Sequence, residues 1–104
     1  NALRRAYEDV LEDLPEDYQQ FAREIYPGRF IVLGDRGDAV LLLQQQINRI
    51  AAQEPDIPTV AEDGIFGRGT QAAVLALQRK LGIDPTGAVG PVLWAQIIAR
   101  GTGY

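Results

Sequence analysis

The segment Asp63-Gly64-Ile65-Phe66-Gly67 predicts a tight turn that leads directly into a helix. An Asp-Gly pair favours a turn with a positive φ at the glycine, and Gly67 frees the backbone just before the helix begins. The helix is expected to end at Gly82, a residue type that commonly follows a helix C-terminus. Its inward-facing residues are predicted to be Ala73, Val74, Leu77 and Leu81.

The same pattern occurs a second time, at Thr86-Gly87-Ala88-Val89-Gly90-Pro91. Pro91 suits the first position of a helix, because the amide hydrogen that it lacks would have no partner there. This helix is expected to end before Gly101. Its apolar residues are Leu93, Trp94, Ile97 and Ile98. Two copies are fewer than a stacked-repeat architecture requires, so we predict an internally repeated loop–helix unit within one globule.

Another helix is predicted before the first of these loops. Gly34-Asp35-Arg36-Gly37 indicates a tight turn, and Asp38 fits either an N-cap or a first-turn acid. The apolar face of the helix consists of Val40, Leu43, Ile47 and Ile50, with Gln44, Gln45, Gln46, Asn48 and Arg49 largely on the other faces. Pro55 and Pro58 bound a loop over about residues 53–62.

Residues 1–32 carry two further amphipathic patterns. Apolar residues from Leu3 to Leu14 recur with helical spacing, and Pro15 separates them from a second such helix that Pro27-Gly28 terminates. We expect these two short helices to pack on the module that follows, because their apolar stripes must be buried somewhere. The predicted organisation is an all-α fold, with an N-terminal extension at 1–32 and the module at 33–104.

The composition excludes several kinds of chemistry. The 104 residues contain no Cys, no His and no Ser, which removes thiol nucleophiles, thiolate and imidazole metal ligands, and a Ser-His-Asp triad. The neighbouring acids Glu62 and Asp63 diverge too much to flank a sugar bond as the two carboxylates of a glycosidase do. We therefore expect no enzymatic activity, no catalytic residues, no metal site and no cofactor.

Charge and hydropathy narrow the range of partners. The net charge of −4 disfavours nucleic acid, whose phosphates require a basic face. No apolar run approaches the roughly 20 residues that span a bilayer, so no membrane partner is expected. The chain opens on Asn1 without an initiator Met or a recognisable signal peptide, and we expect it to be fused to other domains in a longer protein.

In order and spacing, these motifs resemble the peptidoglycan-binding domain family, a small three-helix module often appended to cell-wall hydrolases. The resemblance covers residues 33–99, about two-thirds of the chain. It rests on Gly34, Arg36, Gly37, Val40, Leu43-Gln44, Ile47, the 63–67 loop, Thr70, Ala73-Val74, Leu77-Gln78, Gly82-Ile83, the 86–91 loop and Trp94. Thr86 stands where the family usually has Asp, and the 53–62 loop is longer than in minimal members.

The resemblance implies a non-catalytic module that binds peptidoglycan, through its stem peptide and glycan, and targets an attached protein to the bacterial wall. It also implies an extracellular or wall-associated location. The candidate ligand-binding residues are Arg68, Asp63, Gly64, Phe66, Gly67, Thr70, Gln71 and Arg36. Arginine side chains can bind stem-peptide carboxylates, and backbone N–H groups at a helix start can bind a carboxylate or an acetamido carbonyl.

Structural interpretations of the same residues stay open. The 63–67 loop can serve the turn alone, Phe66 and Trp94 can fill the core, and Gln44 and Gln78 can cap buried backbone groups across a helix interface. The alternative function is a docking or spacer domain of a larger secreted or spore-associated protein. The fold also resembles the pro-segment of certain metalloproteases, although the thiol with which those segments block zinc is absent here.

Overall fold

A computed structural model of the chain describes residues 26–101, and this part folds into three α-helices with no strand. The helices are α3 (Asp38–Gln53), α4 (Arg68–Lys80) and α5 (Pro91–Gly101). The all-α class and the three-helix bundle are therefore confirmed. The two short helices expected before the bundle lie outside the described residues. None of the helices in residues 26–101 has the length and apolar character needed to cross a membrane.

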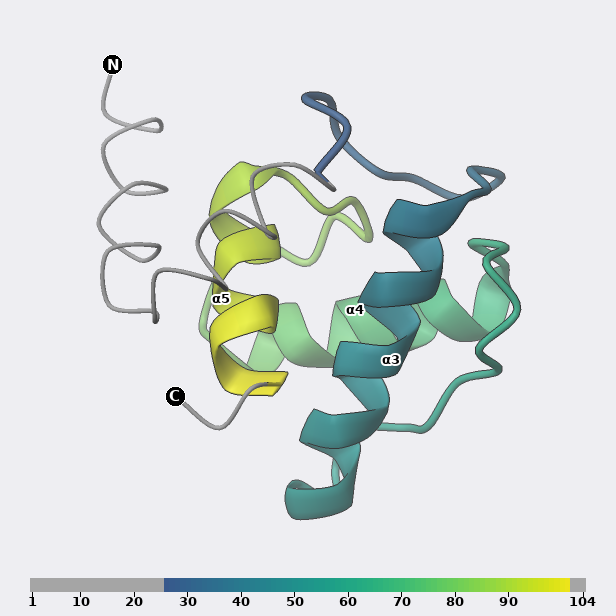
Figure 1. Ribbon diagram of the computed structural model, residues 1–104. Helices are drawn as coiled ribbons and strands as arrows, with labels where there is room; N and C mark the ends of the chain where they lie inside the picture. Colours follow the sequence, from purple (N-terminus) through teal and green to yellow (C-terminus); the bar gives the residue numbers. More distant parts are fainter. Residues whose placement is uncertain (1–25, 102–104) are drawn as a thin grey trace.

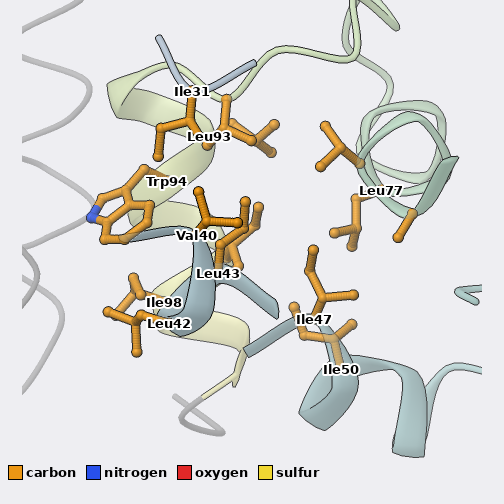
Figure 2. Close-up of a cluster of buried hydrophobic side chains, with 14 of the residues drawn as sticks. Ile31, Val40, Leu42, Leu43, Ile47, Ile50, Leu77, Leu93, Trp94 and Ile98 are labelled. Carbon is orange, nitrogen blue, oxygen red and sulfur yellow. The ribbon is translucent and has the colours of Figure 1, made fainter. Parts of the chain in front are cut away.

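The three helices enclose one hydrophobic core. In Figure 1, α4 crosses behind α3 and α5, which pack against each other in front of it. Figure 2 shows the core side chains that meet between them, with Leu77 contributed by α4 and Trp94 and Ile98 by α5. The residues predicted for the apolar face of α3 are all buried, namely Val40, Leu43, Ile47 and Ile50. Leu81 of the predicted α4 face is half-buried at the edge of the core.

The segment before α3 joins both repeated loops to the bundle. Ile31 is buried and pairs with Val89, each amide donating to the other residue's carbonyl at 2.9 Å. Farther along, the amide of Phe66 donates to the carbonyl of Asp35 at 2.8 Å, and the amide of Gly34 donates to the carbonyl of Phe66 at 2.8 Å. One short stretch thus holds the loops that precede α4 and α5 side by side.

Three details differ from the sequence-based expectations. The tight turn spans residues 32–35, where the amide of Asp35 donates to the carbonyl of Val32 at 3.0 Å, so it precedes the predicted Gly34–Gly37 position. Gly101 is the last residue of α5 rather than the residue after it. The sequence predicts Gln44 and Gln46 largely on the faces of α3 outside its apolar stripe, yet only 1% and 8% of their surfaces are exposed.

Hydrogen bonding explains the burial of Gln44, and close packing explains that of Gln46, whose buried Oε1 atom has no hydrogen-bond partner among the described residues. Gln46 packs against Gly101 at the end of α5. The glycine has no side chain there, and a Cβ on it would lie 2.0 Å from Gln46 Oε1. Gln44 is buried because the loop before α4 supplies partners for its amide group. Hydropathy periodicity assigns any glutamine to a polar face, and so it cannot identify one whose hydrogen bonds are made inside the protein.

The C-terminus of α4 is closed in the way the sequence predicts. Gly82 has φ +73°, a conformation that residues with a side chain rarely adopt. The amide of Ile83 donates to the carbonyl of Gln78 at 3.0 Å, and the amide of Gly82 donates to that of Arg79 at 3.1 Å. These two bonds form a Schellman motif, which satisfies carbonyls at the helix end and turns the chain toward the second loop.

Replacing Gly82 by alanine should lower the free energy of unfolding by about 1 kcal/mol, because the left-handed conformation is costly for any residue with a Cβ. A Cβ at Gly82 would meet no other atom within 4 Å, so the loss reports backbone strain alone. Gly69 is the matched control, because its surroundings are equally open and its φ is not positive. Gly69→Ala should stabilise the protein by about 0.5 kcal/mol in the same urea titration. Equal effects of the two changes would contradict this account.

Candidate functional site

The side-chain amide of Gln44 holds the first repeated loop in place. Its Oε1 atom accepts hydrogen bonds from the backbone amides of Asp63 (3.0 Å) and Gly64 (2.8 Å). Its Nε2 atom donates to the carboxylate of Asp63 (3.0 Å) and the carbonyl of Ile65 (2.9 Å). The remaining partner of Nε2 is Thr70 Oγ1, at 3.1 Å, in the first turn of α4. One buried side chain on α3 therefore fixes both the turn and the start of the next helix.

Gln78 of α4 holds the second loop in the same way. Its Oε1 accepts from the amide of Gly87 at 2.9 Å, and its Nε2 donates to Thr86 Oγ1 at 3.1 Å and to the carbonyl of Ala88 at 3.2 Å. Gly64 and Gly87 both have positive φ values, +72° and +80°. The interpretation of Gln44 and Gln78 as caps of backbone groups across a helix interface is therefore confirmed.

The two loops differ at the residue before the glycine. Asp63 Oδ1 accepts from the amide of Ile65 at 3.0 Å, and Thr86 Oγ1 accepts from the amide of Ala88 at 3.2 Å. The hydroxyl thus takes the structural place of the carboxylate, but it brings no charge. The hydrogen bond from the amide of Ile65, followed by that from Gln44, lowers the pKa of Asp63 below its ordinary value. Asp63 therefore stays ionised at neutral pH.

A small hollow lies at the N-terminus of α4, beside the first loop. Its volume is about 100 Å³. It is lined by Gln44, Ala61, Asp63, Ile65, Gly67, Gly69 and Thr70. The N-cap residue is Gly67, which brings no side chain that could accept from the N–H groups of the first helical turn. Those N–H groups have no partner within a helix, and they carry its positive dipole end. The hollow thus combines backbone donors with one carboxylate.

The structure brings three of the eight predicted binding residues into this hollow and separates the others. Asp63 and Gly67 line it from the loop, while Thr70 forms part of its buried side with only 4% of its surface exposed. Arg68 is exposed at the first position of α4, between two lining residues. Gly64 sits behind the turn, where a Cβ would lie 3.4 Å from the carbonyl oxygen of Gly37.

The other predicted residues have different surroundings. The Phe66 side chain is fully buried in the core and offers no exposed stacking surface, in keeping with the core interpretation. Gln71 packs on the second loop instead of the first, since a Cβ at Gly87 would lie 3.3 Å from its Cγ. Arg36 is exposed and its backbone pairs with Ile65. The hollow is also lined by four residues that the sequence did not predict for it, namely Gln44, Ala61, Ile65 and Gly69. Of these, only Gln44 stands out in the sequence, because Gln78 occupies the matching position of the next helix.

The helix start at the second loop is covered by a side chain of another described segment. A Cβ at Gly90 would lie 2.6 Å from Phe30 Cε2, so the Phe30 ring covers this position. A Cβ at Gly67 would meet no atom within 4 Å. The repeated unit is therefore open at α4 and covered at α5. Within residues 26–101, no three His, Cys, Asp or Glu side chains cluster so that they could hold a metal ion.

Comparison with known proteins identifies relatives of the segment that contains both loops. The model of the family described as "Putative peptidoglycan binding domain" matches residues 36–97. The "Uncharacterized protein in bpoA1 3'region" of Kitasatospora aureofaciens is 44% identical to this chain over 64 residues. The aligned part is 61% of this chain and 50% of that protein, so the chain spans about half the length of the curated relative.

Replacing Gln44 by glutamate tests the contact with Asp63. Glutamate keeps an acceptor for the loop amides but turns an oxygen toward Asp63 Oδ1, which Gln44 Nε2 contacts at 3.0 Å. We expect Gln44→Glu to be clearly destabilised at pH 7 relative to the unchanged chain. The difference should shrink as the pH falls toward about 4, because one of the two carboxyl groups then takes up a proton. Urea titrations across this range measure it.

Gln78→Glu is the matched control, because its partner is the Thr86 hydroxyl, which can donate to a carboxylate. The stability deficit of this variant should depend much less on pH. Similar pH profiles for the two variants would contradict the proposed role of Asp63.

Asp63→Asn tests the pKa of Asp63 itself. The pKa of Asp63 is lower in the folded state than its ordinary value of 3.8. Between these two pKa values the carboxylate takes up a proton more readily in the unfolded state than in the folded state. Asp63 therefore contributes stability above that value, and the contribution is lost as the pH falls through the folded pKa. The unchanged chain should lose stability in this window, and Asp63→Asn should lose less. Urea titrations between about pH 5 and 2 would contradict this if both curves were parallel.

Proposed function

Because this chain belongs to the peptidoglycan-binding domain family, we propose that it is a non-catalytic module that binds the bacterial cell wall and targets an attached protein to it. The observation that carries the proposal is the hollow at the N-terminus of α4, which is preformed, open and held by Gln44. A preformed site needs no ordering of the loop when a ligand binds, which favours affinity. Its small volume suits one polar group of a polymer.

The chemistry of the hollow fits an amide group. The N–H groups of the first turn of α4 can donate to an amide carbonyl, and the ionised Asp63 can accept from an amide N–H. Peptide bonds and the acetamido groups of the glycan both present this pair. Arg68, exposed beside the hollow, can bind a carboxylate of the stem peptide in bidentate fashion. We propose Asp63, Gly67, Arg68 and Thr70 as the residues of the ligand site, with Gly64 supporting the turn.

The remaining predicted residues have supporting or peripheral roles in this proposal. The buried Phe66 ring anchors the first loop in the core and is not exposed to a ligand. Gln71 packs on the second loop and does not line the hollow. Arg36 lies on the strand-like segment paired with Ile65 and extends the binding surface at its edge.

A non-catalytic role is supported by the side chains present at the hollow. Asp63 is its one lining carboxylate, while hydrolysis of a glycosidic bond by a pair of acids requires two that face each other across the sugar. Such a module acts by raising the local concentration of the protein attached to it, so weak binding at one site is sufficient. We further propose an extracellular or wall-associated location, and fusion to other domains.

The N-terminal part of the chain is proposed to be an extension, at 1–32, that packs on the module at 33–104. Two contacts of described residues support this. The ring of Tyr26 lies 5.5 Å from that of Trp94, centroid to centroid, and Ile31 is buried in the core. Apolar residues that precede α3 thus already pack against the bundle.

One observation favours the alternative of a docking domain. Phe30, Val32 and Leu33 expose 54%, 40% and 47% of their surfaces, and Ile65 exposes 41%. Exposed apolar residues that are close together are typical of protein contact surfaces. If the chain is a docking module, Leu33→Asp should abolish binding of the partner domain of the full-length protein and leave binding to the wall unchanged.

The full chain should sediment with purified sacculi, and Arg68→Gln should weaken this binding by roughly threefold to tenfold, because an exposed ion pair is worth up to about 1 kcal/mol and several contacts act together. Arg79→Gln is the matched control. Arg79 is also exposed on α4, but it lies in the last turn, away from the hollow. Sedimentation no greater than that of the denatured chain, with sacculi of several wall chemotypes, would overturn the proposal.

A further inference from the structure

A second concave surface lies along α3, where exposed side chains adjoin the buried Leu42 and Gln46. It is an open groove with a volume of about 660 Å³, several times that of the hollow at α4. It is lined by Leu42, Gln45, Gln46, Asn48, Arg49, Ala52 and Glu62. All but Glu62 belong to α3, and Glu62 belongs to the long loop that links α3 to α4. Nothing in the proposed wall-binding hollow uses these residues.

The groove contains two opposite charges that do not neutralise each other. Arg49 and Glu62 are both exposed, and neither takes part in an ion pair within the described range 26–101. The carboxylate of Glu62 accepts a hydrogen bond from Asn48 Nδ2 at 2.8 Å. One charged side chain comes from the helix and the other from the loop, so the groove presents a positive and a negative group from two different segments, of which Glu62 is held by Asn48.

The loop that carries Glu62 is held firmly against the bundle. Asn48 bonds the backbone of Val60 in both directions: its Oδ1 accepts from the amide at 2.8 Å, and its Nδ2 donates to the carbonyl at 2.9 Å. At the other end of the loop, Lys80 of α4 forms ion pairs with Glu54 and Asp56. The extra length of the 53–62 loop therefore builds a defined edge of the groove.

We propose that this groove binds a peptide residue that carries both a free amine and a carboxylate, with the ammonium at Glu62 and the carboxylate at Arg49. The inference rests on the proposed function in one respect: such a residue would be the diamino acid of the stem peptide. The exposed Gln45 side chain supplies an amide that can pair with the peptide backbone. Among residues 26–101, the lining of the groove contains no aromatic side chain on which a sugar ring could stack.

Titration of the isotope-labelled full chain with three short probes tests this by NMR. The first probe is a synthetic tripeptide that ends in lysine, with a free side-chain amine and a free C-terminal carboxylate. The second has the amine acetylated, and the third has the carboxylate amidated. The first should shift the amide signals of Gln45, Arg49 and Glu62. Each blocked probe should bind about twofold to fivefold more weakly, as expected for the loss of one exposed ion pair.

Two variants assign the charges. Glu62→Gln should remove the preference for the free amine and keep that for the free carboxylate, and Arg49→Gln should do the reverse. Arg79→Gln should leave both preferences unchanged. The proposal is overturned if the shifts lie outside the groove, if the blocked probes bind as well as the first, or if both preferences survive in both variants. Because the probes are small and soluble, these results are independent of whether the chain sediments with sacculi through the α4 hollow.

Discussion

The side-chain amide of Gln44 connects α3 to the loop before α4, and the shape of the candidate site depends on this contact. Five hydrogen bonds reach from one buried amide group to the loop and to Thr70. Without them the buried amide group of Gln44 would lose its partners, which is costly for a buried polar group, and the turn at Asp63 and Gly64 would lose its contact with α3. The start of α4, and the hollow beside it, are therefore set by a residue in the preceding helix.

Repetition of this contact explains how so small a bundle is organised. Gln78 of α4 holds the loop before α5 just as Gln44 of α3 holds the loop before α4. The two copies differ at the residue before the glycine of the loop and at the start of the helix that follows. The first keeps a charged Asp63 and an uncovered helix start, while the second has Thr86 and is covered by Phe30. In the proposed function, the first copy serves binding and the second serves the fold.

Much of the fold could be predicted from the sequence, because apolar periodicity and glycine positions report local structure directly. The α3 core face, the Schellman end at Gly82 and the start of α5 at Pro91 were all predicted correctly. The burial of Gln46 was not, since it depends on packing against the end of α5. For Gln44, periodicity predicted a polar face, and only its match with Gln78 indicated a capping role. The same holds for the site: sequence spacing identified the loop, but it could not show that Gln71 packs on the other loop or that Glu62 and Arg49 line one groove.

We propose that the wall polymer binds at the α4 hollow, which Gln44 keeps in shape. The most direct measurement is NMR titration of the labelled chain with a soluble peptidoglycan fragment that contains both sugar and stem peptide. If the fragment binds there, the backbone amide signals of Gly67, Arg68, Gly69 and Thr70 should shift together and saturate with one dissociation constant. Binding of the fragment that leaves these four amides unmoved would contradict it.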